Sequence, residues 1–255
     1  MRKILTVLTL AMLAGTGAIA QAQDKDTPAT PAAPVARPFK VAPSADLAYA
    51  IEARQRGFTL PGEALISWRA GDGKYSVQAD TKSPLLGKIN ENHSEGTIDT
   101  FGLAPAQFTE KKMRKPATNT SFNRDTKTIG FTDGKLTYPL VGGEQDRASA
   151  AWQLVALARA APDKFVAGST WRFFVAGTHD GEPWTFKVVD REKVALGGTL
   201  GEVDTVHILR APPAGDKGQT LDIWLAPSLE WYPARLRFTD GGDFVEQRLT
   251  NITKK

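Results

Sequence analysis

The feature that most constrains this fold is one long helical segment in a chain whose other segments have the pattern of strands. Residues 145–161, QDRASAAWQLVALARAA, place apolar side chains around more than half of a helical wheel, Trp152, Leu154, Val155 and Leu157 among them. A helix with so wide an apolar surface must be mostly enclosed. Because the chain offers only strands to enclose it, we expect a mainly β fold of the β-rich α+β kind. Its curved antiparallel sheet, an open half-barrel, would wrap around one central helix.

The segments on both sides of this helix alternate apolar and polar residues with a period of two. Leu47, Tyr49 and Ile51 share one face of the run LAYAIEAR, and the run WTFKVV, which begins at Trp184, repeats the pattern after the helix. Such alternation is typical of antiparallel strands with one solvated face. Asp-Gly pairs lie between the strand-like runs and favour tight hairpins. They occur at residues 72–73, 133–134, 180–181 and 240–241.

The chain divides into three parts by composition. Residues 1–22 have a charged start, an apolar middle and small residues at the end, which is the pattern of a signal peptide cleaved after Ala22. Residues 23–44 are rich in Pro and Ala and predict a disordered tether. Residues 45–255 predict a single β-rich domain. We therefore expect an exported, periplasmic protein with no transmembrane segment after cleavage.

Composition and spacing exclude several classes of function. Without the signal peptide the net charge is about +2, so a nucleic-acid partner is not expected. The 255-residue chain has no cysteine, and its three histidines show neither HxH nor HExxH spacing, so we expect no metal and no cofactor. His93, Ser94 and Glu95 are the residue types of a hydrolase triad, but neighbours on a strand point to opposite faces. We therefore expect no catalytic residue there.

The segment DIWLAPSLEWYPARLRF leaves an enzymatic alternative open. Asp222 and Glu230 lie among tryptophans, which are the ingredients of a sugar-cleaving site. The same letters fit two strands joined by a turn, with Glu230 paired to Arg235 or Arg237 and with core residues Trp224, Trp231 and Leu236. We favour this structural interpretation, because two carboxylates eight positions apart are weak evidence of catalysis.

A sheet rolled around one helix often cannot close completely, and the remaining space is an apolar groove. Aromatic and aliphatic side chains of the helix and strands would form its wall, and buried guanidinium groups must either pair with acids or meet an anionic ligand. The expected wall residues are Trp152, Val155, Tyr49, Trp68 and Trp184, and the expected anion contacts are Arg147 and Arg159.

Three short elements carry a resemblance to a known family: Ser94-Glu95-Gly96, Gln145-Asp146-Arg147 and Trp224-Leu225-Ala226-Pro227. With their flanking sequence, residues 47–252 resemble the bacterial exported family "domain of unknown function 3108". The resemblance implies an exported bacterial protein, and it assigns no catalytic residue because the family has no assigned activity. More distantly, the strand–helix–strand layout is similar to the half-barrels that carry lipoproteins across the periplasm. This chain departs from those carriers in having one evident helix where they have several short ones.

Together these observations predict a periplasmic, non-enzymatic binding or carrier protein, whose partner is a hydrophobic small molecule such as a lipid or an acyl chain. One alternative is an envelope-assembly or surface-polysaccharide factor, whose outer face would recognise an envelope protein or a polysaccharide. The other is a glycan-processing enzyme that uses Asp222 and Glu230.

Overall fold

The computed structural model describes residues 31–212 and 218–255, so the expected signal peptide and residues 23–30 of the expected tether lie outside the described residues. All its strands belong to one 15-stranded sheet, as expected. The strands of the first half are β1 (Ala45–Gln55), β2 (Phe58–Gly71), β3 (Lys74–Ser83), β4 (Gly87–Asp99), β5 (Gly102–Lys112), β6 (Thr118–Asn123), β7 (Thr128–Phe131) and β8 (Thr137–Pro139). Those of the second half are β9 (Gln145–Asp146), β10 (Thr170–Ala176), β11 (Gly181–Ala195), β12 (Glu202–Arg210), β13 (Thr220–Leu225), β14 (Pro233–Asp240) and β15 (Asp243–Lys254).

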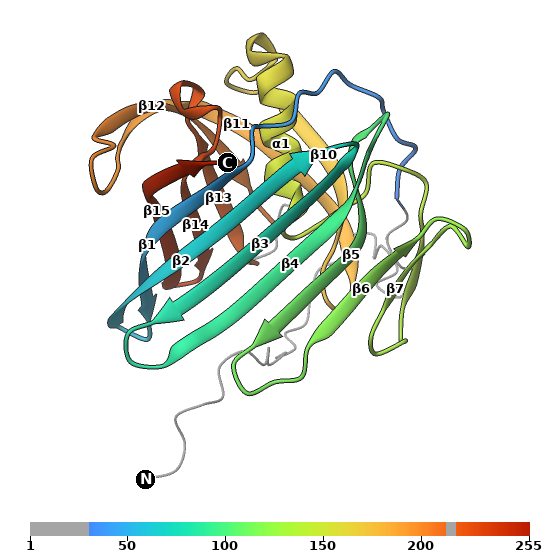
Figure 1. Cartoon of the computed structure of the whole chain (residues 1–255), viewed down its shortest axis with the longest axis horizontal. Helices are drawn as coiled ribbons and strands as arrows, with labels where there is room; N and C mark the ends of the chain where they lie inside the picture. Colours follow the sequence, from blue (N-terminus) through green and yellow to red (C-terminus); the bar gives the residue numbers. More distant parts are fainter. Residues whose placement is uncertain (1–30, 213–217) are drawn as a thin grey trace, which may run out of the picture.

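The strand order is simple, because almost every strand pairs with its neighbour in the chain. It runs from β8 back to β1, then from β15 back to β9, and β1 pairs with β15 in the middle. Every pairing is antiparallel except that of β9 with β10. The sheet curves around the one α-helix of the described residues (Figure 1). It does not close by backbone pairing, because β8 and β9 remain its two edges.

The helix, α1, spans Ser149–Ala160 and is shorter at its start than the predicted 145–161. Gln145 and Asp146 instead form β9, which pairs with β10. The Oδ1 atom of Asp146 accepts hydrogen bonds from the N–H groups of Ala148 and Ser149, both at 2.8 Å, and so caps the helix where it begins. Two 3-10 turns, η1 (Pro162–Lys164) and η2 (Pro227–Leu229), complete the helical structure. None of these helices is long and apolar enough to cross a membrane.

The prediction of an enclosed helix is confirmed. Ser149, Gln153 and Ala156, which lie on its less apolar side, are buried together with the apolar residues. Trp152 stacks on Trp68 of β2, with the ring centroids 4.3 Å apart and the planes 6° from parallel. This contact lies in the main core, which the helix and the concave face of the sheet form together.

The two ends of the sheet meet at β10, whose faces pack into different cores. Phe173 and Val175 belong to the main core, whereas Phe174 and Ala176 belong to a second, smaller core. Successive residues of a strand point to opposite faces, so the second core lies on the other side of β10. Its remaining members come from β5 to β8: Phe108, Phe122, Ile129, Phe131 and Tyr138. The β6–β8 end of the sheet therefore lies over the outer side of β10.

Residues 31–44, which we call the strap, contain no helix or strand but lie on the domain. The strap crosses α1 before the chain enters β1, as the blue trace in Figure 1 shows. The N–H of Lys40 donates to the carbonyl of Ala156 (2.8 Å), and the Trp68 indole N–H donates to the carbonyl of Ala42 (3.0 Å). Ala42 is only 2% exposed, so packed structure begins before the expected boundary at residue 45.

A buried polar network joins the start of the helix to the sheet. Ser94 of β4 donates to Oδ2 of Asp146 (2.5 Å), and the hydroxyl of Tyr75 lies 3.0 Å from that of Ser94. Asp146 and Ser94 are both fully buried. Burial raises the pKa of the Asp146 carboxyl to about 6, although the hydrogen bonds from Ser94, Ser149 and Ala148 oppose the shift.

Substitution of Trp152 by Ala should lower the free energy of unfolding by about 3–5 kcal/mol, because it opens a cavity between helix and sheet and removes the stacking with Trp68. Urea unfolding followed by circular dichroism measures this loss. Arg191→Ala, at an exposed position of β11, is the control and should change stability by no more than about 0.5 kcal/mol. Equal stabilities of the two variants would contradict a packed helix.

Asp146 should make stability depend on pH. Because its pKa is higher in the folded chain than in the unfolded chain, the stabilisation is full below about pH 4 and is lost as the pH rises through 6. Asp146→Asn removes this titration. The difference in unfolding free energy between wild type and Asp146→Asn should therefore fall by about 2–3 kcal/mol from pH 4 to pH 7. A difference that does not change with pH would contradict the raised pKa.

Candidate functional site

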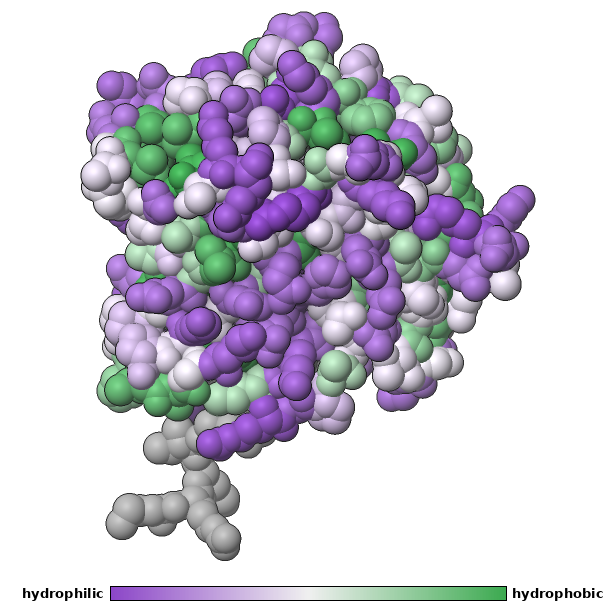
Figure 2. All heavy atoms as spheres, viewed as in Figure 1, coloured by the Kyte–Doolittle hydropathy of each residue, from purple (hydrophilic) through white to green (hydrophobic). Residues whose placement is uncertain are grey.

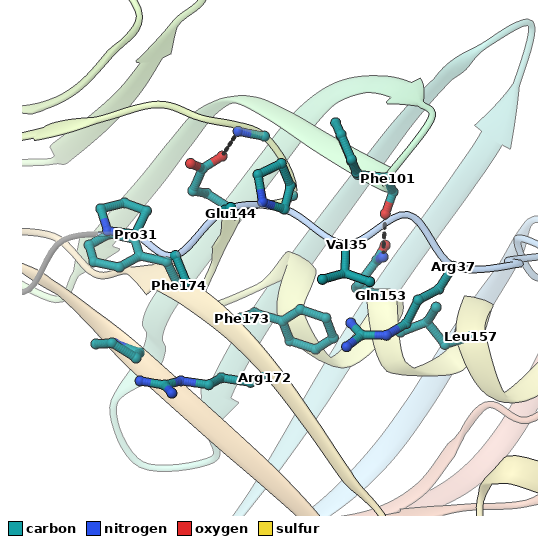
Figure 3. A pocket seen from close by; sticks show the side chains of 16 residues that line it. Pro31, Val35, Arg37, Phe101, Glu144, Gln153, Leu157, Arg172, Phe173 and Phe174 are labelled. Carbon is teal, nitrogen blue, oxygen red and sulfur yellow. Dashed lines mark hydrogen bonds between the residues drawn. The ribbon is translucent and has the colours of Figure 1, made fainter.

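A groove lies between the strap, the helix and β10, and its cavity volume is about 250 Å³. Its lining is mainly apolar and aromatic (Figure 3). The residues that line it are 31–35 and Arg37 of the strap, Phe101, residues 142–144, Gln153 and Leu157 of α1, Arg172, Phe173 and Phe174 of β10, and Pro183. The strap thus forms one wall, and the folded domain forms the others.

Gln153 holds the helix against the turn between β4 and β5. Its Oε1 atom accepts the N–H of Leu103 (2.8 Å), and its Nε2 donates to the carbonyl of Phe101 (2.8 Å). The neighbouring Gly102 has a φ of +107°, and a Cβ atom there would lie 2.4 Å from the Gln153 amide. These contacts fix Phe101, whose ring forms one side of the groove (Figure 3).

Glu144 shapes the rim of the groove, and it is only 3% exposed although it is a polar residue. Its two carboxylate oxygens accept the N–H groups of Val141 (2.6 Å) and Gly142 (2.8 Å). These two hydrogen bonds stabilise the link between β8 and β9.

Positive charge in the groove comes from Arg37 and Arg172. The guanidinium of Arg37 lies over the ring of Trp171, 5.4 Å from its centroid, and Arg172 is exposed on β10. Among the residues that the structure describes, neither arginine forms an ion pair within 4 Å. The groove therefore combines apolar surface with two guanidinium groups that are available to an anion.

A family model described as "Protein of unknown function (DUF3108)" matches residues 47–249. The chain belongs to the DUF3108 family. The family resemblance that the sequence elements indicated is thus confirmed. No curated protein matches this DUF3108 protein.

Solved structures share the fold of this DUF3108 protein at low sequence identity. The "Beta-barrel-like Protein of Domain of Unknown Function DUF1849 from Brucella abortus" is 11% identical, with 85% of this chain and 99% of that chain covered and a TM-score of 0.56. A "putative outer membrane lipoprotein-sorting protein domain from Vibrio parahaemolyticus" is 9% identical over 84% of this chain and 86% of that chain. Its TM-score of 0.35 is too low to support an argument. The first structure supports the fold alone.

None of the seven residues expected at the ligand site lines this groove. Trp152 and Val155 of the helix and Tyr49, Trp68 and Trp184 of the strands are buried in the main core. Burial raises the pKa of the Tyr49 hydroxyl, which donates to the carbonyl of Pro233 (2.8 Å).

The two expected anion contacts have carboxylate partners. Arg159 pairs with Glu230, and Arg147 lies 3.7 Å from Asp180. Glu230 was expected to pair with Arg235 or Arg237, and that expectation was wrong. Glu230 lies in the turn after η2, where the backbone brings it to Arg159 at the end of the helix, whereas Arg235 and Arg237 pair with Glu246.

The residues of the enzymatic alternative lie outside the groove. Asp222 bonds His207 at 2.7 Å, whereas Glu230 bonds Arg159. Trp231 and Leu236 pack in or against the main core as expected. Trp224 is also buried, but it lies outside the main core, between His207 and Arg235 on the opposite face of β13 from Ile223. The groove residues Phe101, Phe173 and Phe174 gave no signal in the sequence, because they come together only when the strap and β10 meet.

Proposed function

We propose that this DUF3108 protein is an exported, non-enzymatic binding protein for an amphipathic anion, whose apolar chain occupies the groove beneath the strap. The observation that carries the proposal is the groove itself, with its aromatic and aliphatic surface beside two arginines that have no carboxylate within 4 Å among residues 31–212 and 218–255. An acyl chain with a carboxylate or phosphate group has this chemistry.

The apolar part of the groove would supply most of the affinity. Phe101, Leu157, Phe173 and Pro183 offer surface to a hydrocarbon chain. Each buried methylene contributes about 0.8 kcal/mol, so even a short stretch of acyl chain would bind measurably. Arg37 and Arg172 would orient the ligand by pairing with its anionic group.

The strap would act as a lid, since its two halves are held differently. Hydrogen bonds to the domain involve Lys40, Ala42 and Pro43, but among the described residues none involves residues 31–37. Residues 31–37 can therefore be displaced at a smaller cost than the rest of the strap, and the cavity would enlarge as they move.

Two further observations support the remaining parts of the proposal. The sequence of residues 1–22 has the pattern of a signal peptide, which supports export. Asp222 and Glu230, the carboxylates of the enzymatic alternative, bond to His207 and Arg159 and do not line the groove, which supports a binding role.

A second candidate is recognition of an envelope partner by the exposed tips of two hairpins. Phe58 is 73% exposed in the β1–β2 hairpin, and Leu85 and Leu86 are 81% and 53% exposed in the β3–β4 hairpin. Because β2 pairs with β3, the two hairpins lie at the same end of the sheet. Figure 2 shows an apolar area at this lower left end of the molecule. Exposed apolar residues of this kind favour an interaction surface.

Binding of cis-parinaric acid, a fluorescent fatty acid, tests the proposed function. Arg172→Glu should weaken binding at least tenfold, because it places a negative charge beside the probe's carboxylate. Arg191→Glu makes the same charge change at an exposed position of β11 outside the groove and should leave the affinity unchanged. No binding to the wild type, or equal binding by both variants, would contradict the groove and favour the second candidate.

A disulfide across the strap tests the lid. A Cβ atom at Gly143 would lie 3.8 Å from Cβ of Pro34, which is the usual separation in a disulfide, and the chain has no other cysteine. Oxidised Pro34→Cys/Gly143→Cys protein should bind cis-parinaric acid at least tenfold more weakly than the same protein after reduction. The reduced protein is the matched control. Equal affinities in the two states would show that the strap does not move when the ligand binds.

A further inference from the structure

Three side chains outside the groove converge on the outer face of β11 and β12. Asp190 and Glu192 lie two residues apart on β11, and Asp190 is opposite His207 of β12. The Nδ1 atom of His207 is 3.7 Å from Oδ1 of Asp190 and 3.7 Å from Oε1 of Glu192. One ligand atom from each residue lies within 4.8 Å of the other two. A cation about 2.1 Å from each ligand atom requires ligand atoms no more than about 4.2 Å apart, so the three groups need to approach one another only slightly to bind it.

The other nitrogen of His207 determines what Nδ1 can do. Nε2 is 2.7 Å from Oδ1 of Asp222 on β13. An ionised carboxylate only accepts hydrogen bonds, so this contact favours the tautomer of the ring that carries its proton on Nε2. In this neutral tautomer Nδ1 has no proton, and its lone pair is on the side of the ring that faces Asp190 and Glu192. Metal-binding histidines commonly have this arrangement, with a carboxylate accepting the N–H of the second nitrogen.

Neighbouring side chains hold these groups in place. The indole N–H of Trp224 donates to Oε1 of Glu192. The Trp224 ring stacks on His207, with the centroids 4.5 Å apart and the planes 6° from parallel. Arg235 covers the ring of Trp224, 4.3 Å from its centroid. Both Glu192 and His207 are therefore oriented before any ion arrives, which favours binding.

The charge of the cluster also favours a cation. Asp190, Glu192 and Asp222 surround one imidazole, and in the described part of the chain none of them has a lysine or arginine within 4 Å.

We propose that Asp190, Glu192 and His207 bind one divalent transition-metal ion, with Asp222 and Trp224 as positioning residues. A nitrogen and two carboxylates suit Zn²⁺, whereas Ca²⁺ requires six to eight oxygen ligands. The site lies on strands β11, β12 and β13 (Figure 1). None of its residues lines the groove.

Calorimetric titration of the tag-free protein with Zn²⁺ tests the site. We expect one ion per chain. His207→Phe should weaken binding at least tenfold, because it keeps an aromatic ring on Trp224 but removes the nitrogen ligand. Asp190→Asn and Glu192→Gln should do the same at exposed positions, where loss of folding is not expected. Asp222→Asn should weaken binding about tenfold through the orientation of His207.

The other two histidines provide matched controls. His179 lies 3.2 Å from Asp133 and His93 lies 3.3 Å from Glu95, so each also pairs with an acid, and alanine at either position should leave Zn²⁺ affinity unchanged. Circular dichroism confirms that each variant is folded. The proposal is overturned if wild type shows no saturable binding up to millimolar Zn²⁺, if His207→Phe binds as tightly as wild type, or if Ca²⁺ binds as tightly as Zn²⁺.

Discussion

A helix that is buried on every side must satisfy its first backbone N–H groups inside the sheet that encloses it, and this requirement shapes the structure. Those groups have no partner within the helix. Asp146 accepts two of them, and Ser94 of β4 binds the second oxygen of the same carboxylate. One buried carboxylate thus joins the helix to the sheet, and the groove beside Gln153 depends on the position that this contact gives the helix.

The short sequence elements that resemble the family have structural roles, and the same contact joins two of them. Ser94 and Asp146 bond to each other, and Gly96 lies at a bulge where a Cβ atom would be 2.2 Å from the carbonyl of Ala104. In the third element, the carbonyl of Ala226 accepts the N–H of Trp231 (2.9 Å) and closes the turn before β14. None of these residues lines the groove. The elements therefore report the fold, not the ligand.

The architecture could be predicted from the sequence because it depends on periodicity. An apolar helix among alternating strands has few ways to be enclosed, and helix residues 149, 150 and 152–158 are buried as that pattern requires. The helix start at residue 145 was wrong, because Asp146 pairs with β10 and its side chain caps the helix. Residues 145 and 146, which precede the helix, are themselves buried, so the apolar periodicity of the sequence does not show where the helix begins.

The sites could not be predicted, because each depends on residues far apart in the chain. The groove needs the strap beside Phe101 and Phe173, and a proline-rich segment with few bulky residues gave no indication that it would pack there. His207 meets Asp190 and Asp222 only through strand register. Histidine spacing along the chain therefore could not reveal the cluster.

The pairing of β1 with β15 has a consequence for how the molecule forms. Hairpins can assemble on each side from neighbouring residues, but the seam in the middle joins Ala45 to Lys254 and so requires nearly the entire chain. Contacts between residues so distant in sequence slow folding, because the loop must close before the contact stabilises it. Until β1 and β15 pair, both half-sheets have an unpaired edge, and a chain that lacks β15 would keep two edges on which it could aggregate.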